Sequence, residues 1–405
     1  MSISQLARSI KESPTLKLNE TAALLREKGE PVIHLGGGEP KSRAPIEAII
    51  SCAALLNTGE VRYTPADGIP ALKKAIIRYT EEHYNKLVGP DNVVASSGAK
   101  QSIMNALYAI LDPKDEVIFP APYWVSYPEM VKLAGGVPII VTPEDGTFHP
   151  TVKEIADMVG SYTKAIILNS PNNPCGVMYS KDFIAEMVSF CEKKSLWLIM
   201  DDLYNRLVFD GKTAPNAFEY ATDQSDHSKL IIVQGVSKMY AMTGFRIGWA
   251  VGNKQVVRAM ANIQSQETSG PATPSQWAAV GALNGIQSSI ETLRMTLENN
   301  RNVLVSRLEA IPGVKVTKPG GTFYCFPDFS AYNKNSQQLA QFLLDKVRVV
   351  TVPGKEFGRE GHLRVSFCGT IGDIKQGTER IQWALDPNSA NELYIGGRKL
   401  VRDWA

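Results

Sequence analysis

The chain has 405 residues, of which 44% are hydrophobic and 21% charged, and 43 basic and 41 acidic residues leave a net charge of +2. This balance argues against binding to nucleic acid or a membrane surface, and no apolar run reaches the roughly 18 residues that a membrane span needs. Five scattered cysteines without a Cys-x-x-Cys pair, five dispersed histidines and a polar N-terminus predict a cytoplasmic protein with reduced thiols and no bound metal.

Residues 1–45 are expected to form an N-terminal arm and part of a small domain, and residues 46–290 a large domain. Near-continuous apolar runs predict strands in the large domain at 92–98, 115–122, 137–142, 164–171, 196–202, 229–237 and 248–252. Such runs are typical of strands buried on both faces of a mostly parallel sheet. Amphipathic stretches between them, at 99–111 and 180–194, predict helices. The expected fold class is therefore α/β, with a three-layer α/β/α large domain.

The pattern changes in residues 291–405, which are expected to hold a linking helix and a smaller α+β domain. The linking helix is predicted over 290–311, where apolar residues recur at helical spacing. Short strands are expected within 314–329, 347–354 and 362–368. The tail after Asp386 shows no recognisable pattern.

Polar groups follow several of the predicted strands, at the edge where open α/β sheets bind ligands. "VVASSGAKQ" ends a strand at Gly98 and opens a helix, and backbone N–H groups at such a helix start can hold a phosphate. "NSPNNPCG" ends another strand with Asn172 and Asn173 among prolines. Taken alone, these stretches also fit an ordinary helix cap and a rigid loop.

Two further strand ends carry charged groups. "LWLIMDDLY" ends a very apolar strand at Asp201, followed by Tyr204; a buried carboxylate there needs a cation or a hydrogen bond, although a helix cap is an equal alternative. In "GVSKMYAMTGFRIG", Lys238 can provide a neutral amine for Schiff-base chemistry, and Arg246 suits an anionic oxygen group. Together the four positions match pyridoxal 5'-phosphate, which has a phosphate, an aldehyde, a ring nitrogen and a ring hydroxyl.

The stretch from Gly235 to Gly248, with the other motifs in the same order, resembles the class I pyridoxal-phosphate aminotransferases of fold type I. The sequence is most similar to the bacterial branch of aspartate and aspartate/prephenate aminotransferases, and the similarity runs from about residue 10 to residue 385. The resemblance implies a homodimer with shared active sites.

The resemblance also assigns roles around the cofactor ring. It implies that Lys238 forms the Schiff base and moves the proton between substrate and cofactor, and that Asp201 keeps the pyridine nitrogen protonated. Tyr204 and Asn173 would bind the ring hydroxyl oxygen. Trp124, in "PAPYWVSYPEM", would stack on the ring and border the substrate.

The phosphate of the cofactor would be held by Gly98, Ala99 and Arg246, and by Tyr63 of "VRYTPADG" from a second subunit. In "HLRVSF", Arg364 would bind the α-carboxylate of the substrate. The N–H of Gly38 in "LGGGEP" and the side chain of Asn173 would assist it.

Residues that could bind the distal carboxylate of a dicarboxylic substrate are matched by Thr15, Lys100 and Lys11, although such residues are usually plain surface positions. The family pattern "GEPDF" is replaced by "GEPKSRAP", so that Lys41 and Arg43 add positive charge near the expected substrate pocket. This departure leaves the range of amino acids open.

The reaction implied is the transfer of an amino group between an L-amino acid, aspartate or glutamate first, and a 2-oxo acid by a ping-pong mechanism. An aminotransferase of aromatic or neutral amino acids is an alternative. A lyase of the same fold, such as a C–S β-lyase or an enzyme similar to aminocyclopropane-carboxylate synthase, would use the same ring-binding residues. A non-catalytic binding protein is a further alternative, against which the presence of Lys238, Asp201 and Arg364 argues.

Overall fold

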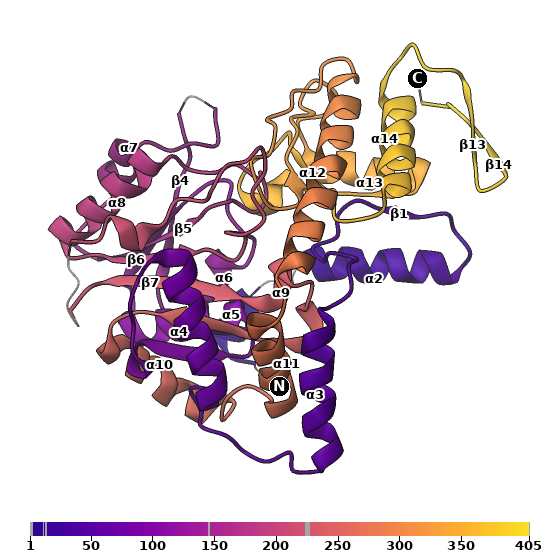
Figure 1. Ribbon diagram of the computed structural model, residues 1–405. Coiled ribbons are helices and arrows are strands. Elements are labelled where there is room, and N and C mark those ends of the chain that lie inside the picture. The colour runs from indigo at the N-terminus through magenta and orange to yellow at the C-terminus, as the bar shows by residue number, and fades with distance from the viewer. Residues whose placement is uncertain (1–2, 11, 13, 145, 223–226, 405) are drawn as a thin grey trace.

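The structure is a computed structural model; it describes residues 3–10, 12, 14–144, 146–222 and 227–404, with residues 14–16 described by their backbone alone. Its centre is a sheet of seven strands (Figure 1). In spatial order these are β2 (Val93–Ser96), β8 (Gly248–Val251), β7 (Leu230–Gly235), β6 (Trp197–Asp201), β5 (Thr163–Asn169), β3 (Glu116–Pro120) and β4 (Val137–Val141). Within this sheet β8 runs antiparallel to both neighbours, and the other pairs are parallel.

Both faces of the sheet are covered by helices. Ile166 and Leu168 pack on one face, which α4 (Pro70–Tyr84) and α8 (Lys181–Lys194) cover, whereas Ile167 packs on the other, beneath α5 (Ala99–Ile110) and α10 (Lys254–Glu267). Neighbouring residues of one strand are thus buried on opposite sides, which explains why the strands read as continuous apolar runs. The seven predicted strands and the α/β class are confirmed.

Strand register brings the polar strand ends to one edge of the sheet. Asn169, the last residue of β5, pairs with Asp201, the last residue of β6. The next strand, β7, ends at Gly235 and leads directly into α9 (Val236–Met239), which carries Lys238. This edge is where the chemistry-bearing side chains are expected to meet.

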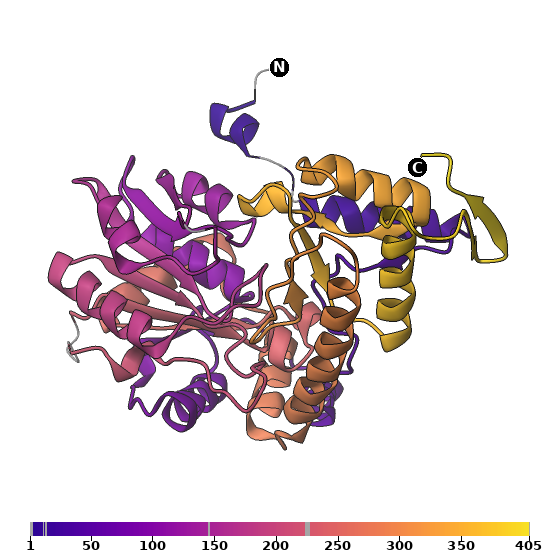
Figure 2. The same ribbon diagram turned by 90° about the horizontal axis from the view of Figure 1, so that it is seen from above.

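The C-terminal part of the chain forms smaller sheets packed with helices (Figure 2). The helix α12 (Ser288–Glu309) packs against α14 (Ile371–Leu385), and a three-stranded antiparallel sheet has the order β11 (Val352–Pro353), β12 (Leu363–Ser366), β9 (Tyr324–Cys325). The N-terminal chain joins this part, because β1 (Ile33–His34) pairs with β10 (Val349–Val350) beside α13 (Ser336–Val347) and α2 (Pro14–Glu27). The domain limits at 45 and 290 remain a prediction.

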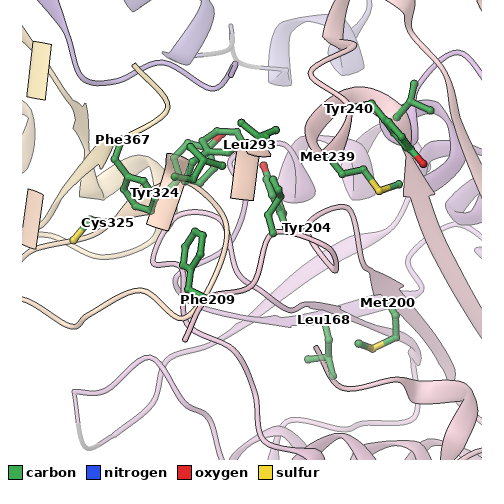
Figure 3. Packing of buried hydrophobic residues seen from close by; sticks show 14 of the residues in the cluster. Leu168, Met200, Tyr204, Phe209, Met239, Tyr240, Leu293, Tyr324, Cys325 and Phe367 are labelled. Atoms are coloured by element: carbon green, nitrogen blue, oxygen red, sulfur yellow. The ribbon is translucent and has the colours of Figure 1, made fainter. Parts of the chain in front are cut away.

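One apolar core continues from the large sheet into the smaller ones. Figure 3 shows Leu168 and Met200 from the sheet, Tyr204 beyond it, and Tyr324 and Phe367 from the C-terminal part, all members of one cluster of buried residues. The ring of Tyr204 meets that of Tyr324 edge-on, with the ring centroids 6.1 Å apart. The two parts are therefore joined by packed side chains as well as by the chain itself.

The remaining elements connect these layers. They are α1 (Gln5–Ser9), α3 (Ile46–Thr58), α6 (Tyr127–Leu133), α7 (Val152–Asp157), α11 (Thr273–Asn284), the 3-10 turns η1 (Pro90–Asn92), η2 (Ala217–Glu219), η3 (Thr243–Phe245) and η4 (Gly354–Phe357), and a hairpin of β13 (Glu392–Ile395) and β14 (Arg398–Val401). The hairpin lies in the tail for which the sequence suggested no pattern. None of the helices in the described ranges is long and apolar enough to cross a membrane.

Candidate active site

A cavity of about 270 Å³ lies where the carboxyl edge of the large sheet meets β12. Nine of the predicted site residues line it: Gly38, Ala99, Lys100, Trp124, Asn173, Asp201, Tyr204, Lys238 and Arg364. A wider surface hollow of about 870 Å³ contains none of them. The chemistry-bearing residues therefore converge on the smaller cavity.

The amine of Lys238 projects into this cavity from α9. Its Nζ donates a hydrogen bond to the carbonyl oxygen of Gly38 at 2.7 Å. Burial lowers the pKa of Lys238 to about 8, and the positive charges of Arg364 and Arg246 act in the same direction. A substantial fraction of this amine is thus neutral near pH 8, the form that attacks a carbonyl carbon.

Asp201 is the buried carboxylate of the cavity. Burial raises its pKa to about 6, while a hydrogen bond that Tyr127 donates to Oδ2 at 2.6 Å opposes that change. Its second oxygen, Oδ1, is buried and has no hydrogen-bond partner in the described part of the chain. The neighbouring Asp202 is held elsewhere, because the hydroxyl of Tyr84 donates to its Oδ2 at 3.0 Å.

A chain of amide groups connects Asp201 with Arg364. The side chain of Asn169 donates to the carbonyl oxygen of Asp201 at 2.7 Å and accepts from the backbone N–H of Asn173, also at 2.7 Å. The side-chain oxygen of Asn173 then accepts a hydrogen bond from Nη1 of Arg364 at 3.0 Å. These hydrogen bonds fix the positions of Asp201, Asn173 and Arg364 relative to one another.

The guanidinium of Arg364 comes from β12 and is 2% exposed. Its Nη2 donates to the carbonyl oxygen of Gly36 at 2.9 Å, and it lies over the ring of Tyr324, 4.3 Å from the centroid. No carboxylate in the described ranges forms an ion pair with it. A buried guanidinium without a protein counter-ion suits an anionic ligand.

A second place for an anion lies at the start of α5. Gly98 has a φ of 90°, and a Cβ there would come 2.3 Å from Nη2 of Arg246, so that glycine alone lets the guanidinium lie along this backbone. A Cβ on Gly248 would likewise come 2.2 Å from the N atom of Ala99. The helix start and the guanidinium thus form a compact positive site of the kind that binds phosphate.

Trp124 and Lys100 form one wall of the cavity. The Nζ of Lys100 lies 5.0 Å from the centroid of the Trp124 ring. Partial burial and the nearby charge of Arg246 lower the pKa of Lys100. Tyr204 and Tyr324 also line the cavity, and burial raises the pKa of Tyr204 well above its usual range.

Other predicted residues are not brought to the cavity within one chain. Tyr63 is 95% exposed and belongs to a separate surface hollow; its contribution from a second subunit remains a prediction. Lys11 lies outside the described residues, and only the backbone of Thr15, within α2, is described. Lys41 of the "GEPKSRAP" departure forms an ion pair of 2.9 Å with Asp373 of α14.

The structure adds residues that the sequence did not identify. Asn19 from α2, Glu39, Asn169, Thr243 and Tyr324 also line the cavity. Asn169 stood within a quoted motif and at a strand end, which could have singled it out. Tyr324 and Asn19 carried no such signal, because their position depends on contacts between distant segments. Within the described residues, no cluster of His, Cys, Asp and Glu side chains could hold a metal ion.

The sequence and the fold match one family throughout. The sequence model of "Aminotransferase class I and II" matches residues 30–381. An aspartate aminotransferase of Bacillus subtilis is 33% identical over 96% of this chain and 100% of its own length. A probable aspartate/prephenate aminotransferase of Thermus aquaticus is 37% identical over 95% of this chain and 99% of its own. The solved aspartate aminotransferase of Thermus thermophilus with maleate has a TM-score of 0.90 at 33% identity, and covers 94% of this chain and 99% of its own.

Proposed function

Because this chain belongs to the class I and II aminotransferases, we propose that it transfers an amino group between a dicarboxylic L-amino acid and a 2-oxo acid, with pyridoxal 5'-phosphate as cofactor. The observation that carries the proposal is the convergence of three groups on one cavity. These are the amine of Lys238, the buried carboxylate of Asp201 and the unpaired guanidinium of Arg364.

The chain's own residues fit this cofactor. Oδ1 of Asp201 is a buried acceptor that lacks a donor among the described residues, and a protonated pyridine nitrogen would supply one. The positive site of Gly98, Ala99 and Arg246 would hold the phosphate, together with Tyr63 from a second copy of the chain. When bound, pyridoxal phosphate supplies an electron sink for the charge that develops at the substrate Cα.

Tyr204, Asn173 and Trp124 complete the proposed cofactor contacts. The hydroxyl of Tyr204 and the amide of Asn173 would bind the ring hydroxyl oxygen, and the indole of Trp124 would cover the ring face. Each of these side chains lines the same cavity as Lys238.

Two residues would act on the substrate itself. Arg364 would bind the α-carboxylate through its planar fork and so orient the Cα–H bond. With a pKa of about 8, Lys238 would take the proton from the substrate Cα as a neutral amine, acting as a general base. It would then give that proton to the cofactor, acting as a general acid. The contact between Lys238 and Gly38 would hold the amine inside the cavity between these events.

Purified protein incubated with aspartate and 2-oxoglutarate is expected to form oxaloacetate and glutamate in equal amounts. A visible absorbance band should accompany the bound cofactor, and borohydride should remove it while labelling Lys238. Release of pyruvate and ammonia from cysteine conjugates without any transamination would instead identify a lyase. A protein that neither absorbs in the visible range nor responds to added pyridoxal phosphate would contradict the proposed cofactor.

Substrate preference is expected to depend on Lys100. Lys100→Ala should raise the KM for aspartate about tenfold, because one charge-assisted hydrogen bond to the distal carboxylate is lost. The KM for alanine, which has no such group, should stay within twofold. Steady-state kinetics with both donors measure this difference. Lys41→Ala is the control, since Lys41 pairs with Asp373 outside the cavity; equal changes in the two variants would exclude the assigned role.

A further inference from the structure

The C-terminal hairpin lies beyond residue 381, where the match to the family model ends. Its strands β13 and β14 pair from Glu392↔Val401 to Ile395↔Arg398, with Gly396 and Gly397 in the turn. In Figures 1 and 2 the hairpin extends beside α14, and its turn contacts the segment that follows α2. It therefore connects two segments that are far apart in the sequence.

The base of the hairpin is anchored on α13 and α14. The ring of Trp404 meets those of Trp383 and Phe342 edge-on, with centroid distances of 5.6 and 5.5 Å. Trp404 also donates from Nε1 to the carbonyl oxygen of Ala384 at 3.2 Å. Next to it, Asp403 forms an ion pair of 3.0 Å with Lys346, so this end is held by apolar and polar contacts together.

The turn of the hairpin holds the segment that follows α2. Gly396 packs so closely on Pro31 that a Cβ on the glycine would come 3.1 Å from the proline ring. Nη1 of Arg398 forms an ion pair with Oε1 of Glu30 at 2.8 Å. The other carboxylate oxygen of Glu30 is paired with Arg348 at the end of α13, at 2.9 Å. Glu30 thus joins the segment after α2 to the hairpin and to the end of α13.

The helix α2 is held by one narrow apolar stripe, in which Leu18 and Leu25 are partly buried on either side of Ala22. Of its side chains that the structure describes, Ala22 alone is fully buried, in a small cluster with Val32, Leu344 and Val350. Asn19, less than one turn before Ala22, lines the active-site cavity. The contact at Ala22 therefore lies between the cavity and the hairpin contact at Glu30, three residues beyond the end of α2. The backbone N–H of Glu30 donates to the carbonyl oxygen of Leu25 at 3.0 Å, so a shift of Glu30 would also move α2 and Asn19.

We propose that the C-terminal hairpin is a clamp on α2 and that Arg398 is a positioning residue for substrate binding. By fixing the end of α2 through Glu30, Arg398 holds the amide of Asn19 at the cavity, where it can donate a hydrogen bond to the distal carboxylate of the substrate. This role rests on the proposed function, because it requires a dicarboxylic substrate in that cavity.

Arg398→Ala is expected to raise the KM for aspartate about threefold, the size of effect that an exposed ion pair allows, with kcat and the visible spectrum unchanged. Amide hydrogen exchange in residues 17–27 should become faster in the same variant. The matched control is Lys399→Ala, on the same strand, because Lys399 pairs with Glu392 within the hairpin. This control should change neither quantity.

The charge partner gives a second test. If Arg398 acts through Glu30, the double variant Arg398→Ala/Glu30→Gln should have the KM of Glu30→Gln alone. Additive effects, or a higher KM without faster exchange in α2, would overturn the proposal, as would faster exchange with an unchanged KM. Hydrogen exchange needs no catalysis, so the clamp is tested even if wild-type protein does not transaminate. A wild-type protein that does not transaminate would contradict the proposed function and leave the clamp to be judged by hydrogen exchange.

Discussion

Lys238→Ala is expected to abolish turnover while pyridoxal phosphate still binds. We expect kcat to fall at least about 10⁴-fold, since both the covalent attachment and the general base are lost. The contacts proposed for the ring and the phosphate do not involve Lys238, so added cofactor should remain bound without the band that borohydride removes. Single-turnover kinetics with aspartate and an absorbance titration with the cofactor measure the two effects separately.

The control for this variant is Lys229→Ala. Lys229 directly precedes β7, the strand that leads to Lys238, and its Nζ donates to the carbonyl oxygen of Ser195 at 2.8 Å, away from the cavity. Turnover of the control should stay within about twofold of wild type, in line with the small effects of most surface substitutions. Near-normal turnover of Lys238→Ala would remove this lysine from the mechanism.

Arg364→Ala is expected to reduce kcat/KM by about 10² to 10⁴, because two charge-assisted hydrogen bonds of about 1.5–3 kcal/mol each are lost. KM should account for much of the change, as the α-carboxylate loses its only expected cationic partner. Arg364→Lys keeps the charge but not the planar fork, so it should fall between wild type and Arg364→Ala. Initial rates over a range of aspartate concentrations separate kcat from KM.

The Arg364→Ala experiment needs a control variant and a test that the variant is folded. Arg359→Ala is the control, because Arg359 does not line the cavity. Its Nη2 donates to the carbonyl oxygen of Gly146 instead. Thermal denaturation should show that Arg364→Ala is folded, even though Asn173 and Gly36 lose their donor. A folded Arg364→Ala with kcat/KM within threefold of wild type would exclude its role as the carboxylate clamp.

The large sheet could be predicted from the sequence because its strands are buried on both faces. Neighbouring residues such as Ile166 and Ile167 face opposite sides of the sheet and both are apolar, so each strand reads as an unbroken apolar run. The short strands of the C-terminal part were also predicted, since β9, β10, β11 and β12 lie within 314–329, 347–354 and 362–368, but the limits of β9, β10 and β11, which span two residues each, were not. Strands that short take their shape from neighbouring segments and leave little local pattern.

The C-terminal hairpin was missed although a local signal existed. Gly396 and Gly397 have φ values of 55° and 78°, which suit the two-residue turn of a hairpin, and a Gly-Gly pair between two short segments can indicate such a turn. What could not be predicted is where the hairpin packs. That depends on the rings of Trp404, Trp383 and Phe342, which come from three separate segments.

The site was predictable where its residues end strands. Asp201, Asn173 and Lys238 follow apolar runs, and the topology brings such ends together. Contacts made across the fold could not be predicted, as with Tyr127, which donates to Asp201 from α6. The ion pair of Lys41 with Asp373 also needed the structure, since the sequence placed that charge near the substrate.

The continuous apolar core, which runs from Met200 in the sheet through Tyr204 to Phe367, has a consequence for cooperativity. Two bodies with separate cores could unfold one after the other, each with its own midpoint. Here the same buried cluster supports both, so a void opened on either side lowers the free energy of unfolding of the whole cluster. Tyr204 and Tyr324, which line the active-site cavity and belong to this cluster, should therefore lose their packing in one and the same unfolding transition.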